Sequence, residues 1–462
     1  MQVTFKNIGP LKNVSLDLSN DLIVLCGPNN SGKTYAAYSI YGLYEAIEKR
    51  KNEMRTNEEA FVDIFNENDD FTKKIEKTIN TKDFFETYLK KSTETLFTKA
   101  LSTIFSANGN TFAQSECDLF YKDIEYVINY EADCRGANFQ KDYNYTYNYH
   151  LKYANTENIP HISKDRLYIE IELESNEYLQ KNTNLIHFVK SLNADVNATI
   201  LNLLLYNVLF NKTYNHIFTA ERAALVIFNN EIRNFTATKN GDEILLPYPS
   251  PISDSLKFLN TMRGYIQRDA QTEFAFLADD LENAILGGVI SMSRDGEVQF
   301  SPHDNEAKNL SAHLTASLVK SLSTIVLYLR YRAKKNDFII IDEPELNLHP
   351  DNQRLVARFI TKLVHHGFKI MISTHSDYII RELNNLIMLY SGGEKANDLC
   401  EKYGYKTDEL LDSTRVSAYL FDLNGGAKSL TVDETGFEVA TIDVEINKLN
   451  QTQEDIFFTL FD

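Results

Sequence analysis

The order of apolar and polar residues along the chain predicts strands that alternate with helices. Residues 2–5 and 14–18 alternate as half-buried strands do, and Leu22–Cys26 is wholly apolar, as in a strand covered on both faces. Four later segments continue the series as strand, helix, strand and helix: residues 338–341, 350–366, 369–373 and 376–386. Buried strands that alternate with helices predict a parallel or mixed sheet with helices on its faces.

The segment between residues 46 and 215 has a different pattern. Residues 52–101 are charged, with apolar residues at helical spacing, and residues 197–208 predict an apolar helix. Tyrosine alternates with polar residues over 143–149. This pattern indicates either a strand whose tyrosines pack on a neighbour, which we favour, or a platform for stacking bases. Residues 166–173 also predict a strand. We therefore expect a compact, mostly helical arm with some strands.

The remaining segments predict two hairpins and two helices. Residues 294–297 are a turn between the strand-like residues 289–293 and 298–301. A second hairpin is expected within residues 416–437, with its turn at 424–426. Helical patterns cover residues 314–331 and 442–461.

Composition narrows the classes of function. A length of 462 residues with 43% hydrophobic residues predicts two or three domains with substantial cores. The chain has no run of 18 apolar residues, begins without a signal-peptide pattern and holds four scattered cysteines. Together these features predict a reduced, cytoplasmic protein without a membrane span. A net charge of −18 repels nucleic acid on average, so contact with DNA would need a local basic patch or a partner.

The most informative motif follows the apolar strand Leu22–Cys26. It has the pattern G-x-x-x-x-G-K-T of a phosphate-binding loop, and its members are Gly27, Pro28, Asn29, Asn30, Ser31, Gly32, Lys33 and Thr34. The glycines let backbone N–H groups turn toward the phosphates of a nucleotide triphosphate. Lys33 adds a positive charge near the β- and γ-phosphates, and the Thr34 hydroxyl can bind Mg²⁺.

A second motif consists of carboxylates at the end of a later apolar strand. Residues 338–341 are apolar, and Asp342 and Glu343 follow directly. Because the carboxyl ends of parallel strands meet at one edge of a sheet, Asp342 is expected beside the phosphate-binding loop, where it can hold Mg²⁺ through water. Glu343 is then placed to orient and polarise a water for attack on the γ-phosphate.

Two further segments complete a recognisable set. Residues 342–350 have the pattern D-E-P-E-x-x-L-H-P, and residues 373–376 are Ser-Thr-His-Ser at the end of the next strand. Together with residues 27–34, they resemble the ABC-type ATPase heads of the SMC, RecF and OLD groups. The resemblance implies that Lys33 binds phosphate, that Thr34 and Asp342 hold Mg²⁺, and that Glu343 is the catalytic carboxylate. It further implies that His375 senses the γ-phosphate and that residues 346–349 form a D-loop at a dimer interface.

The resemblance also implies a fold class, an α/β, ABC-type P-loop ATPase head with a mixed sheet. About 300 residues separate Lys33 from Asp342, which resembles heads that are split by an inserted arm. We expect the head at residues 1–45 and 216–400, a mostly helical arm at 46–215, and a hairpin and helix at 401–462 that complete the head.

Two segments depart from the family pattern or leave alternatives open. The signature of ABC-type heads, which contacts the nucleotide of the opposite subunit, is expected at residues 313–322. Ser317 can donate to a phosphate there, but Leu318 replaces the expected glycine, which puts fast hydrolysis in doubt. Arg222, in a segment similar to an A-E-R motif of these ATPases, either approaches the nucleotide or forms a structural salt bridge. No Q-loop glutamine is assigned.

The residues after His375 carry no D-x-D pair and no HNH-like cluster, so the chain is expected to lack its own nuclease. In this it resembles the stand-alone ATPase subunits of antiphage defence systems such as Septu, retron-associated pairs and PARIS. That resemblance implies a homo-oligomer, at least a dimer, which gates a separate nuclease or toxin and responds to a phage-encoded trigger. The alternatives are a RecF- or SMC-like repair ATPase that clamps DNA, and a nucleotide-locked scaffold with little turnover.

Overall fold

The chain divides into two compact units in the computed structural model. The larger unit is made of residues 2–44, 98–118 and 212–462, and the smaller of residues 45–97 and 119–211. The structure describes residues 2–56, 75–80, 91–120, 125–131, 149–155, 166–173, 215–237, 248–268, 270–293, 295–303 and 309–461.

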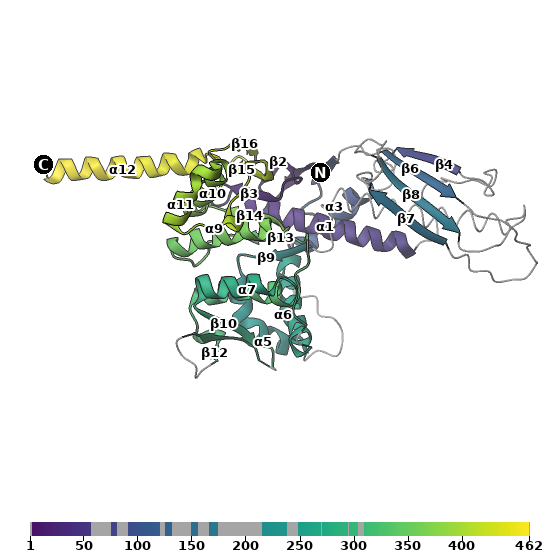
Figure 1. The fold of residues 1–462 in the computed structure, drawn as a ribbon, viewed down its shortest axis with the longest axis horizontal. Helices are drawn as coiled ribbons and strands as arrows, with labels where there is room; N and C mark the ends of the chain where they lie inside the picture. Colours follow the sequence, from purple (N-terminus) through teal and green to yellow (C-terminus); the bar gives the residue numbers. More distant parts are fainter. Residues whose placement is uncertain are drawn as a thin grey trace, which may run out of the picture. The chain divides into compact units, whose positions relative to one another are not determined.

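The larger unit is built on a six-stranded sheet with the order β16-β15-β3-β14-β13-β9 (Figure 1). Its strands are β3 (Leu22–Cys26), β9 (Asn215–Phe218), β13 (Phe338–Asp342), β14 (Lys369–Thr374), β15 (Val416–Phe421) and β16 (Ala427–Leu430). All neighbouring pairs are parallel except β15 and β16, which form the predicted hairpin. The predicted fold class, an α/β P-loop ATPase fold with a mixed sheet, is therefore confirmed.

The inner strands are apolar because both faces of the sheet are covered. Every residue of β3 and β13 is buried, which is typical of parallel strands between helices. The covering helices include α1 (Lys33–Thr56), α9 (Pro350–His365) and α10 (Asp377–Ser391). The short helix α11 (Asn397–Tyr403) follows them and buries none of its residues. His349 caps α9 and Ser376 caps α10 with their side chains, so both helices begin directly after motif residues.

The register of the sheet brings the predicted motifs to one edge. Asp342 at the end of β13 lies opposite Ser373 in β14, and Thr374 at the end of β14 lies opposite Cys26 in β3. On the other side of β13, Ile341 lies opposite Phe218, the last residue of β9. The ends of these four strands form what we call the carboxyl edge, where α/β folds commonly bind ligands.

A second group of elements in the larger unit includes α5, α6, α7, β10 and β12, which are labelled in Figure 1. Of these, α5, α6, α7 and β10 contact α8 (Ser317–Tyr331). These elements are α5 (Arg222–Ala237), α6 (Ser250–Gln267), α7 (Ala275–Leu281), β10 (Gly288–Met292), β11 (Val298–Pro302) and β12 (Leu310–Ser311). The antiparallel pair of β10 and β11 confirms the predicted hairpin. Arg330 near the end of α8 forms a buried ion pair with Glu282, 2.7 Å from Nη2 to Oε2, which fixes α8 against a π-helical turn at Glu282–Leu286.

The start of the chain belongs to a small three-stranded sheet, whose first two strands are antiparallel. Strand β1 (Gln2–Ile8) pairs with β2 (Leu11–Asp17), and β5 (Glu116–Phe120) joins their sheet beside β1. Helix α3 (Lys91–Ile104) precedes β5. Strands near residues 2–5 and 14–18 were expected from the alternation of apolar residues, and β1 and β2 confirm them.

The described part of the smaller unit contains more strand than the sequence predicts. Its four-stranded sheet has the order β4-β6-β8-β7, with β4 (Ile75–Asn80), β6 (Glu125–Glu131), β7 (Tyr149–Asn155) and β8 (Arg166–Leu173). Strand β8 confirms the prediction for residues 166–173. The prediction of helix at residues 75–80 is wrong, because Ile75 and Ile79 belong to a strand that pairs with β6. Residues 197–208 and most of the tyrosine row lie outside the described residues.

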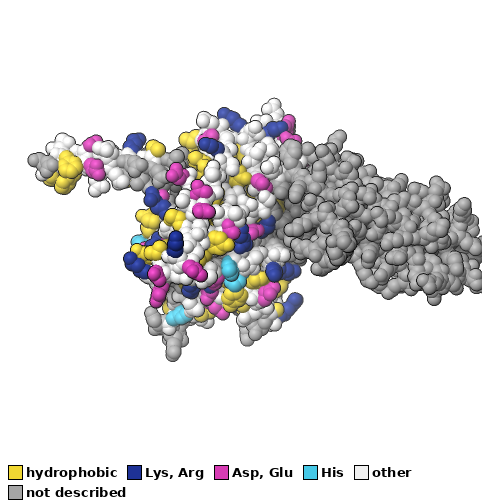
Figure 2. Space-filling model, turned by 45° about the horizontal axis from the view of Figure 1, so that its top comes forward, with side chains coloured by type: hydrophobic (Ala, Val, Ile, Leu, Met, Phe, Trp, Pro, Cys, Tyr) yellow, Lys and Arg dark blue, Asp and Glu magenta, His cyan; other side chains and the backbone are white. Residues whose placement is uncertain are grey.

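The predicted C-terminal helix is present as α12 (Ala440–Phe461). Figure 2 shows apolar side chains at its end, where Ile456, Phe457, Phe458, Leu460 and Phe461 are all more than half exposed. Among the described residues, no helix combines the length and the apolar character that crossing a membrane requires.

Candidate nucleotide-binding and hydrolysis site

The phosphate-binding loop joins β3 to α1 at the carboxyl edge, as predicted. Gly27 has φ of +137° and Gly32 has φ of +97°, backbone conformations that side chains rarely adopt. A Cβ on Gly27 would lie 2.4 Å from the Phe421 carbonyl oxygen, so a side chain at this position would displace β15 from the loop. The glycines of the motif are therefore required by the backbone itself.

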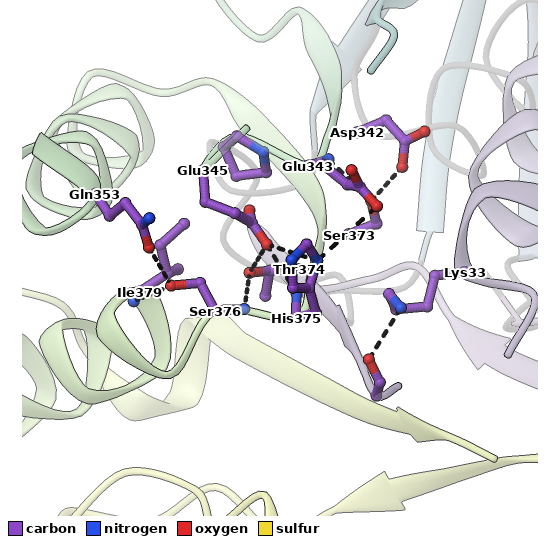
Figure 3. A network of polar contacts seen from close by, with 12 residues as sticks. Lys33, Asp342, Glu343, Glu345, Gln353, Ser373, Thr374, His375, Ser376 and Ile379 are labelled. Carbon is purple, nitrogen blue, oxygen red and sulfur yellow. Dashed lines mark hydrogen bonds and ion pairs between the residues drawn. The ribbon is translucent and has the colours of Figure 1, made fainter. Parts of the chain in front are cut away.

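Lys33 is buried, with 5% of its surface exposed, and its ammonium group lies inside the loop. Its Nζ donates to the carbonyl oxygens of Gly27 at 2.9 Å and Pro28 at 2.8 Å, and Figure 3 shows it among the site residues. Burial lowers the pKa of Lys33, while the nearby carboxylates of Glu343 and Asp342 act in the opposite direction. The loop carbonyls hold the side chain where a phosphate would meet it.

Asp342 lies beside the loop at the end of β13, fully buried. Its Oδ1 accepts hydrogen bonds from Thr34 Oγ1, at 3.2 Å, and from Ser373 Oγ. Burial raises the pKa of Asp342 to about 6, against the effect of the bond from Ser373. Its second oxygen, Oδ2, is buried without a hydrogen-bond partner, which is a costly state for a carboxylate.

These residues fit a divalent cation. A hydroxyl and a carboxylate are oxygen donors of the kind that Mg²⁺ prefers, and Oδ2 of Asp342 is a buried acceptor that lacks a donor. Ser31 Oγ in the loop is also buried without a partner, as expected of a group that awaits phosphate oxygens. Thr34 and Asp342 would hold the ion, which would neutralise phosphate charge when bound.

Glu343 follows Asp342 in a backbone conformation that is unusual for its residue type. Its φ is +47°, in the left-handed region, where a non-glycine residue stores strain. Its N–H donates to the carbonyl oxygen and the hydroxyl of Ser373, each at 3.1 Å. The strained turn carries the chain out of the sheet directly after Asp342, and Figure 3 shows the Glu343 side chain near His375.

His375 lies beside two carboxylates (Figure 3). Its Nδ1 is 3.3 Å from Glu345 Oε1 and 3.9 Å from Glu343 Oε1. Glu345 Oε1 also accepts from the His375 backbone N–H and from Thr374 Oγ1, both at 2.8 Å. Glu345 and Ser373 carry no predicted role, although they lie in the motifs at residues 342–350 and 373–376. Their contacts depend on the pairing of β13 with β14, which the motif letters do not encode.

Arg222 was predicted either to approach the nucleotide or to form a salt bridge, and its contacts support neither role. Its side chain is buried, with 2% of its surface exposed, and donates to backbone carbonyls rather than to a carboxylate. Two of these carbonyls belong to Asp342 and Glu343. Burial lowers the pKa of Arg222, while the negative charge of Asp342 acts to raise it.

The predicted signature lies at what we call the α8 end, residues 313–317. Ser317 is the first residue of α8 and is exposed, and Leu314 is 75% exposed. Leu318, in contrast, is half-buried and packs against the core. Within the described part of the chain, no hydrogen bond joins Ser317 to the loop or to the carboxylates. The structure therefore brings Lys33, Thr34, Asp342, Glu343 and His375 together, while Ser317 forms none of the hydrogen bonds described for this site.

Comparison with protein families matches residues 1–380 of the chain to the AAA ATPase domain family. The match covers most of the 462 residues, and the chain belongs to this family. The phosphate-binding loop and the carboxylates of β13 lie within the matched range. No curated protein matches the chain.

The chain is also similar to solved ATPase structures at low identity. One is an SMC head bound to the C-winged helix domain of ScpA, with 10% identity, a TM-score of 0.32, and coverage of 93% of this chain and 96% of that one. The SMC head domain from Thermotoga maritima has 10% identity and a TM-score of 0.28, with coverage of 94% of this chain and 98% of that one. The recombination mediator protein RecF has 11% identity and a TM-score of 0.24, with coverage of 93% of this chain and 97% of that one. At these scores the similarity adds no argument to the sheet order and the family match.

Proposed function

We propose that the chain binds ATP with Mg²⁺ and hydrolyses it to ADP and phosphate. The observation that supports this most is the convergence of Lys33, Thr34, Asp342, Glu343 and His375 on the carboxyl edge, from segments about 300 residues apart in sequence. A purely structural cluster would satisfy its buried groups internally. Here the inner oxygen of Asp342 and the hydroxyl of Ser31 have no partner, which is the state expected of a site shaped for a ligand.

Each side chain has a distinct task in this proposal. Lys33 binds phosphate oxygens, and Thr34 and Asp342 hold the cation. Glu343 accepts a proton from the attacking water, and His375 orients that water or the γ-phosphate. Glu345 fixes the imidazole of His375 through its two contacts to that residue, from the ring and from the backbone N–H. Most of the rate would come from positioning and charge rather than from covalent chemistry.

Hydrolysis can be tested with Glu343→Gln, which keeps the size of the side chain and removes its basicity. We expect release of phosphate to fall about 100-fold or more, since a positioned general base contributes on that scale. Binding of a fluorescent ATP analogue should stay within about twofold of wild type, because the change leaves the phosphate contacts intact. Glu401→Gln, an exposed change on α11, is the matched control. Equal turnover in wild type and Glu343→Gln would refute the assignment.

We further propose that two copies assemble in the ABC-type manner, with the α8 end of one copy facing the nucleotide of the other. Ser317 and Leu314 are exposed in the single chain, and Ser317 has no described bond to the loop of its own chain. A helix N-terminus with free N–H groups suits a γ-phosphate. ATP-dependent dimers in light scattering, strengthened by Glu343→Gln, would support this arrangement. A monomer at all nucleotide states would refute it.

The biological role that we propose is control of a separate effector, a nuclease or toxin, in antiphage defence, with a phage-encoded trigger. The support is the sequence after His375, which has no D-x-D pair, together with the acidic net charge of −18. On the face shown in Figure 2, basic and acidic side chains are interspersed rather than gathered in a basic stripe. Co-purification of a nuclease encoded beside this gene, released by phage infection, is the expected result.

A DNA-binding experiment with the purified chain distinguishes the defence role from the alternative, a repair ATPase that clamps DNA. That alternative predicts tight, salt-dependent binding of duplex DNA by the purified chain with ATP. We expect no such binding near physiological salt, because the net charge opposes it. DNA binding without an effector partner would replace the defence role with the repair role and leave the ATPase assignment unchanged.

A further inference from the structure

We propose that Arg222 is a positioning residue for ATP hydrolysis, which holds the strained backbone at Glu343 without contacting the nucleotide. This inference rests on the proposed function and deepens it. Arg222 begins α5, which follows β9 after residues 219–221, and its side chain reaches the turn at the end of β13. The A-E-R segment thereby acquires a role that neither of the two sequence-based interpretations included.

The guanidinium group uses all of its donors on backbone carbonyls. Nε donates to Ser321 at 3.0 Å. Nη1 donates to Thr219 at 3.1 Å and Asp342 at 2.7 Å, and Nη2 donates to Glu343 at 2.8 Å and Pro344 at 3.4 Å. A guanidinium has five N–H groups, so these five contacts use every donor of the side chain. No donor is left for a phosphate, and contact with the nucleotide would require one of these bonds to break.

Three of these carbonyls are consecutive, from Asp342 to Pro344, and they belong to the turn that carries the two site carboxylates. Glu343 has φ of +47° within this turn, a conformation that persists only where its surroundings hold it. Ser373 holds its N–H from one side and Arg222 holds its carbonyl from the other. With the backbone fixed on both sides of the Cα, the direction of the Cα–Cβ bond of Glu343 is also fixed, which sets the point from which its carboxylate reaches the site.

The bond to Ser321 extends this clamp to α8. Ser321 lies one turn into the helix that begins at Ser317, and its carbonyl is the only acceptor of Arg222 Nε among the described residues. Arg330 and Glu282 anchor the other end of the same helix. Arg222 therefore joins a rigidly held helix to the turn of Glu343. A lysine cannot reproduce this function, because an ammonium lacks the planar fork.

The test is Arg222→Lys, which keeps a positive charge but loses the fork. We expect kcat for ATP hydrolysis to fall about 10- to 100-fold, since small displacements of a catalytic group have effects of that size. The affinity for a fluorescent ATP analogue should stay within about twofold, because Arg222 contributes no phosphate contact. Adding Glu343→Gln to Arg222→Lys should cost little more than Glu343→Gln alone, because both changes remove the same step. Arg268→Lys, at an exposed arginine that follows α6, is the matched control.

A second measurement does not depend on turnover. Amide hydrogen exchange of a peptide over residues 340–348 should be faster in Arg222→Lys than in wild type or Arg268→Lys, because the turn loses its anchor. Thermal unfolding shows whether the variant folds. Equal kcat and equal exchange in Arg222→Lys and wild type would overturn the inference, as would loss of nucleotide affinity in parallel with kcat. A wild-type chain without turnover would instead refute the proposed function, and the exchange result would still decide the role of Arg222 in holding the turn.

Discussion

The carboxyl edge of the central sheet and the α8 end differ in how deeply their side chains are buried and in how many hydrogen bonds those side chains form within one chain. At the carboxyl edge, Lys33, Asp342 and Glu345 are buried: Lys33 donates hydrogen bonds to the loop carbonyls, and the two carboxylates accept them from β14 and the residue that follows it. At the α8 end, Ser317 is exposed and Leu314 is 75% exposed. The first region is built to hold a ligand within one chain. The second is a surface whose proposed ligand belongs to another copy.

This difference separates two kinds of evidence for an ATPase. The carboxyl edge supports nucleotide binding on the geometry of one chain alone. The α8 end supports hydrolysis in an assembly only if its helix N-terminus meets a phosphate in trans. The two regions should therefore respond differently to mutation: changes at the edge should affect binding or chemistry in every molecule, and changes at the α8 end should be corrected by a second, intact copy.

The largest effect is expected at the edge, from Lys33→Ala. This change removes the buried ammonium group and leaves the carbonyls of Gly27 and Pro28 without their donor. Loss of a charge-assisted contact to phosphate should weaken ATP binding about 100-fold and reduce hydrolysis at least as much. Titration of a fluorescent ATP analogue measures the first effect and phosphate release the second. Affinity within a factor of two of wild type would show that the loop does not bind phosphate through Lys33.

A change at the α8 end is the next largest and tests the proposed assembly. Ser317→Glu places a negative charge at the end of the helix that would face the γ-phosphate, so hydrolysis should fall about tenfold or more. A 1:1 mixture with Lys33→Ala should recover about a quarter of the wild-type rate, because half of randomly paired dimers are mixed and each has one intact composite site.

The two variants serve as controls for each other, because each is defective alone at the same total concentration. Recovery requires that one copy supplies the loop and the other supplies Ser317. If mixed dimers form, as seen by native mass spectrometry, and activity does not return, then Ser317 acts within its own chain or not at all. The difference between the two regions would then be one of exposure only.

How far the sequence predicts each region follows from what its motifs encode. Residues 27–34 and 342–343 have chemistry that depends on residue type and on position after a buried strand, so their meeting at one edge of the sheet could be expected from the motifs, whereas the pairing of β13 with β14 could not. The role of Arg222 could not be, because its acceptors are backbone carbonyls, which carry no sequence signal. Strand β4 was missed because Ile75 and Ile79 fit helical spacing, and its pairing with β6 is not local.

A smaller effect within the edge is expected from Glu345→Gln. The change keeps the size of the side chain and removes the charge that faces His375 Nδ1 at 3.3 Å. We expect kcat to fall about tenfold while nucleotide affinity is maintained, because His375 loses an orienting partner but Lys33 keeps its contacts. His375→Ala should have a similar effect, and the double variant should be little worse than either. Additive losses would show that Glu345 and His375 act separately.

The smallest effect is expected from Leu318→Gly, which introduces the glycine of the family pattern at the α8 end. Leu318 is half-buried and packs against the core, so the change should lower the free energy of unfolding by about 2 kcal/mol through lost burial and backbone entropy. Hydrolysis by the assembled protein should rise about two- to threefold, because glycine lets a backbone N–H come closer to a phosphate. A loss of stability without a gain in rate would show that Leu318 belongs to the packing of α8 alone, and that slow turnover, if observed, has its cause at the carboxyl edge.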